Sequence, residues 1–410
     1  MNRIIEWWET EKIRKTFFEA VYLMFFFVFL LQRVLWTTMF TTWYPEYFQL
    51  FLRILMVFFI AAKLGSGKRF SLSEIIWFLL VTMALVAVWQ KAGYDEQLDV
   101  ALLIAGAYET DFKKILKVYL LVEIAVMIVT MAASRLGIVE NLIYHRGDNI
   151  RMAFGYVYPT DYTAHIFYIV LAWCFLRGAA VSYLECCIFA LLGAFALIFC
   201  DARMNAGCLM LTAVVFAVLR FWNTKAKETF THVKKDKIEK KISGIFVTAP
   251  VICATVMLSL TWFYSEENSF LSLINRWLSN RLSLGKRGFT EFGVPLFGQW
   301  LPIVGNGGST EPRDNYFFLD SSYVNILLSY GVVLFCVVMA MHLWNQIQLR
   351  RNAMYAGMLV MCLLFVQCMV EHHMMEIAYN PFLFMILADK KSLVEINNNG
   401  ERRGRKTQKN

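Results

Sequence analysis

Long apolar runs are the feature that most constrains how this chain can fold. Residues 17–36, 184–199 and 324–341 are nearly free of charged side chains, and a helix needs about 20 such residues to cross a bilayer. Apolar residues make up 58% of the chain and charged residues 17%, whereas a soluble domain has roughly 45 to 50% and about 25%. The sequence therefore predicts an all-α, polytopic integral membrane protein built as a helical bundle.

The apolar runs predict about 12 transmembrane helices. Two of them, residues 98–108 and 377–388, are short for a full crossing, so tilted, re-entrant and non-helical alternatives remain open. The first run is expected to stay in the membrane as an anchor, because acidic residues precede it and no small-residue cleavage site follows it. The predicted helices are residues 17–36, 47–62, 72–89, 98–108, 115–134, 161–176, 180–199, 204–222, 244–263, 322–343, 353–370 and 377–388.

The distribution of Lys and Arg predicts which side of the membrane each segment faces. Of the 40 basic residues, 27 lie in segments assigned to one side, 10 on the other side and three within spans. Because basic residues concentrate in cytoplasmic loops, both termini are predicted to be cytoplasmic. Residues 1–388 then form a membrane-embedded domain with a basic cytoplasmic loop at 223–243, and residues 389–410 form a disordered basic tail. The net charge of +9 fits loops that face an anionic leaflet rather than a nucleic-acid partner.

The longest predicted loop, residues 265–320, lies on the outer, extracytoplasmic side. Loops of this length are usually functional or disordered, and this one is rich in aromatic residues. Apolar residues at 271, 274, 277 and 278 have a helical spacing. We therefore expect a short amphipathic helix, followed by an irregular Gly-rich segment that packs over the outer mouth of the bundle.

Several arginines lie close to or within the apolar runs. Arg203 lies where two apolar helices meet with almost no loop, and a charge at that depth is costly and usually functional or paired. The alternative is that Arg203 snorkels or pairs with Asp201. Arg33 and Arg53 are expected to snorkel from span ends. Arg151, in the turn before the predicted sixth span, is a weak signal by itself, because a loop arginine is more often solvated than catalytic.

Metal, nucleotide and disulfide chemistry are not predicted. His372 and Glu376 are one helical turn apart, a spacing that can hold a metal, but a polar helix end facing water explains them as well, and we expect no metal ligands. The Gly-Ser-Gly-Lys run at 65–68 lacks the spacing of a phosphate-binding loop. All nine cysteines lie within spans or at a span edge, without zinc-type spacing.

Four short motifs occur in an order that is typical of one family of membrane enzymes. The motifs are Arg151-Met-Ala-Phe-Gly-Tyr-Val-Tyr-Pro before a helix, Asp201-Ala-Arg203 between helices, Arg281 followed by Pro295-Leu-Phe-Gly298, and Asp320-Ser-Ser-Tyr323 with its continuation to Gly331. This ordered set resembles the O-antigen and capsule polymerases (Wzy type), relatives of the O-antigen ligases. Tyr158-Pro159-Thr160 departs from the His-Pro-Asn of many relatives, whereas Asp320 occupies the position where the ligases place a histidine and so favours polymerase over ligase.

The resemblance implies a glycosyltransferase that acts on the outer side of the bacterial cytoplasmic membrane. Its donor and acceptor are undecaprenyl-pyrophosphate-linked oligosaccharide repeat units, which it joins into O-antigen, capsule or exopolysaccharide. The departing diphosphate supplies the driving energy, so no ATP, cofactor or metal is implied. A flippase and a chain-length regulator are the implied protein partners, and nucleic acid is not a partner.

The resemblance also implies roles for individual residues. Arg203 and Arg281 would hold the pyrophosphate, because a guanidinium binds phosphate oxygens bidentately and stays charged. Asp320 would take the acceptor proton; alternatively, it caps the predicted tenth span. The implied substrate-binding residues are Arg151, Tyr158, Arg287 and Tyr323.

Proteins of other classes also carry many helices and buried arginines. A transporter or flippase of lipid-linked oligosaccharide is the main alternative, and a structural scaffold is another. Transporters tend to have two related halves and short loops, whereas this sequence has no evident internal repeat and one long outer loop. These features favour the enzyme.

Overall fold

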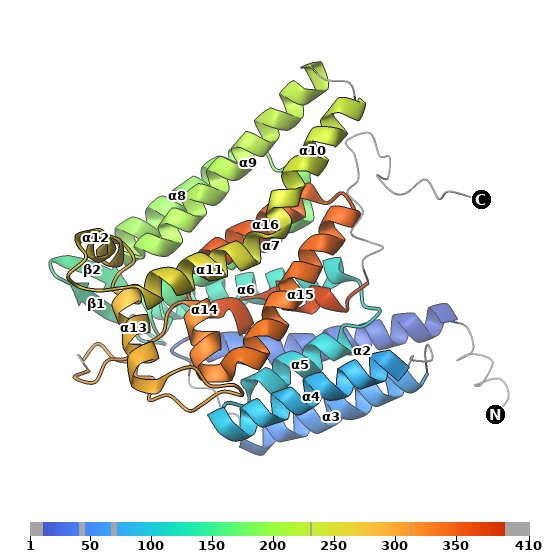
Figure 1. Cartoon of the computed structure of the whole chain (residues 1–410), viewed down its shortest axis with the longest axis horizontal. Helices are drawn as coiled ribbons and strands as arrows, with labels where there is room; N and C mark the ends of the chain where they lie inside the picture. Colours follow the sequence, from blue (N-terminus) through green and yellow to red (C-terminus); the bar gives the residue numbers. More distant parts are fainter. Residues whose placement is uncertain (1–10, 41–45, 67–71, 230–231, 312, 390–410) are drawn as a thin grey trace.

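The computed structural model is a bundle of helices with one small hairpin (Figure 1), and it describes residues 11–40, 46–66, 72–229, 232–311 and 313–389. The first half contains α2 (Glu11–Leu35), α3 (Glu46–Gly65), α4 (Leu72–Ala92), α5 (Glu96–Gly106), α6 (Phe112–Arg135), β1 (Ile143–Arg146), β2 (Asn149–Met152), α7 (Pro159–Arg177), η1 (Gly178–Ala180) and α8 (Tyr183–Cys200). The second half contains α9 (Arg203–Thr229), α10 (His232–Val247), α11 (Ala249–Trp262), α12 (Ser269–Trp277), α13 (Arg281–Phe292), α14 (Ser322–Asn325), η2 (Ile326–Tyr330), α15 (Gly331–Arg351), α16 (Tyr355–Gln367), η3 (His373–Met375) and η4 (Pro381–Ile386).

Within the described residues, seven helices are long and apolar enough to cross a membrane, or eight if the bent pair α10 and α11 forms one span. This confirms a helical membrane protein, although with fewer qualifying spans than the 12 predicted. The predicted span at 98–108 corresponds to α5, which has 11 residues and, at about 1.5 Å per residue, is too short to cross.

The predicted helix at 377–388 does not form. Asn380 instead accepts a hydrogen bond from the backbone N–H of Phe382, and Pro381 begins the 3-10 helix η4. The side chains from Phe382 to Met385 are at most 1% exposed. Non-helical backbone is tolerated at membrane depth where protein surrounds it, so burial within the bundle explains why the apolar run is not an α-helix.

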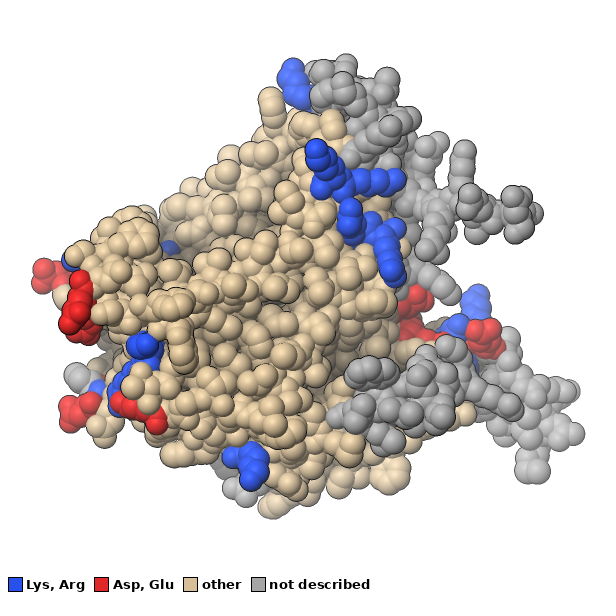
Figure 2. Space-filling view, viewed as in Figure 1, with Lys and Arg blue, Asp and Glu red and all other residues tan. Residues whose placement is uncertain are grey.

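The outer surface of the bundle is apolar, as contact with lipid requires. Phe58 on α3, Leu121 on α6 and Leu191 on α8 are 65 to 70% exposed. Figure 2 shows that the visible charged side chains gather mainly toward two opposite ends, with a broad band of uncharged residues between them. Exposed apolar surface on this scale marks a site of interaction, and here that site is the belt that faces the membrane.

The first and last described segments lie at the same end of the bundle. Arg14 on α2 donates to Glu109 at 3.4 Å, and Glu19 on α2 accepts from the backbone N–H of Asp111 at 3.0 Å. Asp111 in turn forms an isolated β-bridge with Asp389. That both termini are cytoplasmic stays a prediction, since residues 1–10 and the predicted tail beyond Asp389 lie outside the described residues.

Two predictions about local structure need correction. Residues 143–152 form an antiparallel hairpin in which Tyr144 is opposite Arg151, so the fold is not purely helical; the Gly147-Asp148 dipeptide, with Gly147 at φ 59°, is a hairpin turn signal that was missed. The predicted basic loop at 223–243 is largely helical, because α9 continues to Thr229 and α10 begins at His232.

Arg33 and Arg53 do not snorkel. Both guanidinium groups donate to the carboxylate of Asp99, which is fully buried on α5. Arg53 also pairs with Asp95 at 2.7 Å, and Arg33 with Glu96 at 3.3 Å. Paired charge inside the bundle joins α2 and α3 to α5, which explains why these arginines tolerate burial.

The predicted amphipathic helix of the outer loop is confirmed as α12. The side chain of Asn268 caps it by accepting from the N–H groups of Phe270 and Leu271. After α13 the chain is irregular, and hydrogen bonds hold it to other segments. The N–H of Gly308 donates to the carbonyl of Val157 at 2.9 Å, and the hydroxyl of Tyr144 donates to the carbonyl of Asn306 at 3.1 Å. The outer loop thus packs over the start of α7 and the hairpin.

The same loop also fits into a break between η2 and α15. Gly331 begins α15 with φ 86°, and a Cβ there would come within 2.4 Å of the backbone nitrogen of Gly298. The N–H groups of Val332 and Val333 donate to the carbonyls of Pro295 and Leu296 at 3.0 and 3.1 Å. Glycine is needed at this crossing because two backbones touch and the conformation is left-handed.

Candidate functional site

Arg281 is the centre of a buried polar cluster at the outer loop. It is the first residue of α13 and is 8% exposed. Its Nε donates to the carbonyl of Val370, its Nη1 to Leu278 at 3.1 Å and its Nη2 to Glu371 Oε1 at 3.2 Å. The Asp320 carboxylate lies 3.9 Å from Nε. The guanidinium therefore joins three segments that are far apart in the sequence.

The charges in this cluster depend on one another. Burial opposes the charge of Arg281, but Asp320 and Glu371 outweigh it and raise the pKa of the guanidinium. Burial raises the pKa of the Glu371 carboxyl to about 8, although Arg281 acts in the opposite direction. The cationic form of Arg281 is thus strongly favoured, while negative charge at Glu371 is costly.

Asp320 lies just before the N-cap position of α14. The N-cap residue of α14 is Ser321, so the capping alternative for Asp320 is not what the structure shows. Its side chain is 18% exposed and faces Arg281. Ser322 holds the start of α14 in place, since its hydroxyl donates to the carbonyl of Glu371 at 2.6 Å and its N–H donates to Cys368 at 3.0 Å.

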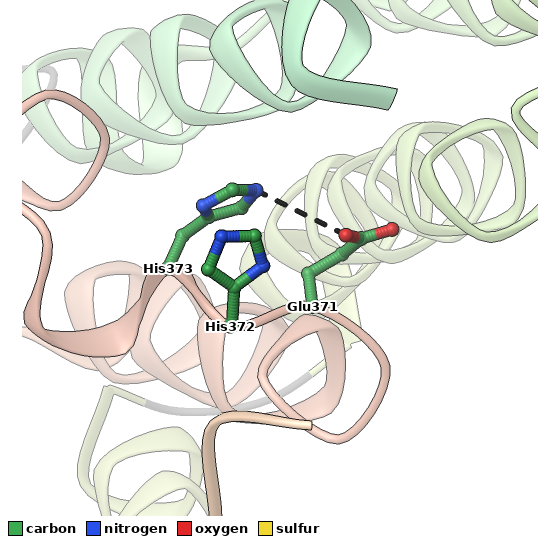
Figure 3. Close-up of side chains that lie close together, drawn as sticks. All are labelled: Glu371, His372 and His373. Carbon is green, nitrogen blue, oxygen red and sulfur yellow. Dashed lines mark ion pairs between the residues drawn. The ribbon is translucent and has the colours of Figure 1, made fainter. Parts of the chain in front are cut away.

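The turn at 371–376 is buried and is not the water-facing helix end that the sequence suggested. Glu371, His372 and His373 lie close together (Figure 3), and His373 is fully buried. Glu376 contacts both imidazoles, with one carboxylate oxygen 3.1 Å from His372 Nε2 and the other 3.1 Å from His373 Nδ1. The backbone forms the 3-10 turn η3, which turns these polar groups toward the bundle.

Arg151 is buried, contrary to the expectation for a loop arginine. It lies on β2 at 3% exposure; its Nε donates to Cys200 at 3.1 Å and its Nη1 to the Tyr158 hydroxyl at 3.0 Å. Nη2 is buried with no hydrogen-bond partner among the described residues. Because buried donors are nearly always paired, this free N–H group is a candidate contact for an anionic ligand.

Tyr158 contacts Arg151 and lies within electrostatic range of the Arg281 cluster. It precedes Pro159 as the N-cap residue of α7, and it contributes to the electrostatic environment of both Arg281 and Tyr316. Burial raises the pKa of Tyr316, and Asp320 and Tyr158 add to that effect. The structure therefore brings the predicted residues Arg151, Tyr158, Arg281 and Asp320 into one polar region.

Arg203 belongs to a more exposed cluster. Its side chain is 51% exposed, and its Nε pairs with Asp201 Oδ1 at 2.9 Å, which is the paired alternative stated above. Asp201 ends α8 in the left-handed conformation with φ 42° and also pairs with Arg146 at 3.3 Å. Burial lowers the pKa of Arg146, and Arg151 adds to the lowering, so this cluster borders the Arg151 region.

Two of the predicted substrate-binding residues have other contacts. Arg287 is half-exposed on α13, where it pairs with Glu291 at 2.8 Å and lies over the ring of Phe317 at 5.1 Å. Tyr323 is fully buried, and its hydroxyl donates to the carbonyl of Phe365 at 3.0 Å. Tyr323 has no accessible surface for a substrate, so we remove it from the candidate site.

Sequence reasoning missed several residues of this region. Glu371 was not singled out, although its carboxylate contacts Arg281, which lies 90 positions earlier. Asp161 lies within electrostatic range of Glu371 and was not singled out. An acidic residue next to a pair of histidines in an otherwise apolar segment was the signal that could have found the turn.

No protein-family model, no curated protein and no solved structure matches this chain. Its function must therefore be inferred from its own residues. Chemically, the site offers two buried guanidinium groups for an anion and a carboxylate that can accept a proton. Both kinds of group lie at the end of a membrane-embedded bundle.

Proposed function

We propose that this chain polymerises undecaprenyl-pyrophosphate-linked oligosaccharide repeat units into O-antigen, capsule or exopolysaccharide. The observation that carries the proposal is the buried pairing of Arg281 with a partly exposed Asp320, close to Arg151 and its free Nη2. Anion binding and proton removal are the two functions that glycosyl transfer from a lipid diphosphate requires. The motif order that resembles Wzy-type polymerases supports the same reaction.

The reaction would break the bond between the anomeric carbon of the donor and its phosphate oxygen. A new bond forms from that carbon to a hydroxyl oxygen of the acceptor, and the lipid diphosphate departs with the bonding electrons. Arg281 and Arg151 stabilise the charge on the departing diphosphate. Asp320 takes the hydroxyl proton. Exchange of the glycosyl phosphate bond for a glycosidic bond, with release of the lipid diphosphate, would provide the driving force, so no nucleotide enters the balance.

Arg203 has a different role in this proposal from the one implied by the sequence. Its half-exposed side chain at the start of α9 suits a first contact with an anionic headgroup at the rim. Tyr158 would position substrate next to Arg151, and Arg287 would contact the sugars. The site would face the outer side of the cytoplasmic membrane, where a flippase delivers substrate and a chain-length regulator limits the product.

The test is a reconstitution with purified protein and lipid-linked repeat units as the sole substrate. A polymerase produces a ladder of lengthened lipid-linked glycans. An O-antigen ligase produces no ladder from this substrate, because it requires a second kind of acceptor. In cells, deletion of the gene is expected to leave single lipid-linked repeat units on the outside. Complete retention of normal polymer in the deletion strain would refute the proposal.

A second candidate, transport of lipid-linked oligosaccharide, is supported by one observation. His165 on α7 and Glu123 on α6 form a fully buried pair at 2.8 Å, and the His165 ring stacks on Tyr379 at 4.2 Å, which stacks on His373 at 3.7 Å. Ionisable groups inside a bundle often mark substrate or proton pathways. Loss of a transporter would remove repeat units from the outer face altogether, which separates this candidate from a polymerase.

A further inference from the structure

The Glu371, His372 and His373 cluster in Figure 3 is not used by the reaction proposed above. One potential ligand atom from each residue lies within 4.8 Å of the other two. The Glu371 and His373 side chains are at most 2% exposed, and that of His372 is 19% exposed. Three nitrogen or oxygen ligands therefore converge at a site with little access to water.

The hydrogen bonds of this turn leave one nitrogen of each imidazole free. The Glu376 carboxylate contacts Nε2 of His372 and Nδ1 of His373. The remaining nitrogens, His372 Nδ1 and His373 Nε2, are buried without a hydrogen-bond partner in the part of the chain that the structure describes. His373 Nε2 lies 3.9 Å from Glu371 Oε2, whereas the other oxygen of Glu371 is held by Arg281.

Carboxylates outnumber the cations that contact the turn directly. Asp320, Glu371 and Glu376 are three carboxylates, and Arg281 is the guanidinium that contacts two of them. Arg151 lies within electrostatic range of Glu371, and Arg33 within range of Glu376. A buried carboxylate has to be compensated, by a proton or by a cation.

We propose that Glu371, His372 and His373 bind a divalent transition-metal ion of the zinc class, with Glu376 orienting both imidazoles. Imidazole nitrogens with a carboxylate oxygen are a ligand set that suits zinc. Histidine ligands commonly place their other ring nitrogen against a carboxylate, as Glu376 provides here. The ion would take the place of protons in compensating the buried carboxylates. The site shares Glu371 with the Arg281 cluster but takes no step in the glycosyl transfer proposed above, and it departs from the sequence-based expectation that the chain has no metal ligands.

The geometry needs only side-chain movement. Metal–nitrogen distances of about 2.0 to 2.1 Å place the ligands of a tetrahedral centre about 3.3 Å apart. The present separations, 3.9 Å between His373 Nε2 and Glu371 Oε2 and at most 4.8 Å within the set, would have to shorten by about 0.5 to 1.5 Å on binding. Glu371 keeps its contact with Arg281 through Oε1, so the ion would tie the turn at 371–376 to the start of α13. A fourth position stays open for water.

The test measures metal directly. The full chain is purified without a polyhistidine tag, stripped with a chelator and titrated with Co²⁺, with visible d–d absorption and bound metal per chain as readouts. The parent protein is expected to bind about one ion with high affinity. Glu376→Gln is expected to weaken binding by about 10 to 100-fold, and His373→Gln and Glu371→Gln by more than that.

His342→Gln is the matched control. His342 on α15 is fully buried with both ring nitrogens unpartnered among the described residues, and its ring neighbour is Phe365. The His342→Gln variant is expected to bind Co²⁺ with the same affinity and stoichiometry as the parent protein. Failure of the parent to bind Co²⁺ or Zn²⁺, or unchanged binding by His373→Gln and Glu376→Gln, would overturn the site and show that protons balance the charge. If the His373→Gln variant does not fold, the Co²⁺ affinity of the Glu376→Gln variant still tests the metal site. Because this experiment contains no lipid-linked substrate, its result does not bear on the polymerase proposal, which the reconstitution tests separately.

Discussion

The corner between α8 and α9 and the start of α13 each place an arginine at the first position of a helix, with opposite results. Arg203 is half-exposed and pairs with Asp201 two positions away. Arg281 is buried and bonds to Val370 and Glu371, which are 89 and 90 positions away. Arg203 finds its partner within its own corner and stays near the surface, whereas the distant partners of Arg281 lie in the interior, so that pairing with them buries its side chain. The family resemblance implies the same role for both arginines, and the buried contacts of Arg281 are the reason why we propose it, rather than Arg203, as the group that holds the diphosphate.

Substitution of Arg281 is expected to have the largest effect. Arg281→Lys keeps the charge but loses the planar array of donors, so polymer formation in the reconstituted reaction should fall by a factor of about 100 to 1,000. Arg281→Ala should also lower membrane abundance, since breaking a buried pair costs about 3 to 5 kcal/mol. Arg276→Lys, at an exposed position on α12, is the control. Equal polymer from both lysine variants would remove Arg281 from the mechanism.

Asp320→Asn is expected to have the second-largest effect on polymer formation. The carboxylate is lost, and general base catalysis typically contributes a factor of about 100 to 10,000. Because Asp320 lies before the N-cap position of α14, which Ser321 occupies, folding and membrane abundance should stay at the parental level. Asp314→Asn in the same loop, where Asp314 is exposed, controls for loss of a negative charge. Polymer within a few-fold of the parent would mean that the proton leaves by another route.

Arg203→Lys tests the comparison between the two arginines, because the family resemblance and the structure predict different losses of polymer for this variant. A pyrophosphate grip at Arg203 would make this variant lose most polymer. An exposed pair is worth about 0.2 to 1 kcal/mol, so the structure predicts a loss of less than about tenfold. The initial rate should be measured at low and high salt, where a rim contact weakens with added salt. A loss as large as that of Arg281→Lys would reverse the ranking of the two regions.

Tyr323→Phe should have the smallest effect. It removes the hydrogen bond to the carbonyl of Phe365, which is worth about 1 kcal/mol of stability. A small drop in the thermal midpoint of the purified protein is expected, with the apparent KM for the lipid-linked substrate unchanged. A large change in KM at constant stability would restore Tyr323 as a substrate contact.

The sequence predicted the features of this fold that depend on local pattern. Apolar runs indicated the long helices, and the spacing of residues 271–278 indicated α12. The motif residues Arg151, Tyr158, Arg281 and Asp320 do lie in one region. What the sequence did not predict depends on distant contacts: Arg151 is buried because the hairpin brings it to the end of α8. Residues 377–388 contain the 3-10 helix η4 instead of a transmembrane α-helix, which the bundle accommodates because it encloses them.

The contact between Gly298 and Gly331 has a consequence for exchanging parts between proteins. The outer loop supplies carbonyls at Pro295 and Leu296 to the first turn of α15, and neither glycine tolerates a Cβ at the crossing. A chimera that takes residues 265–320 from another protein would separate two surfaces that fit each other. The transplantable unit therefore runs through residue 333, so loop and helix start should be inherited as one module.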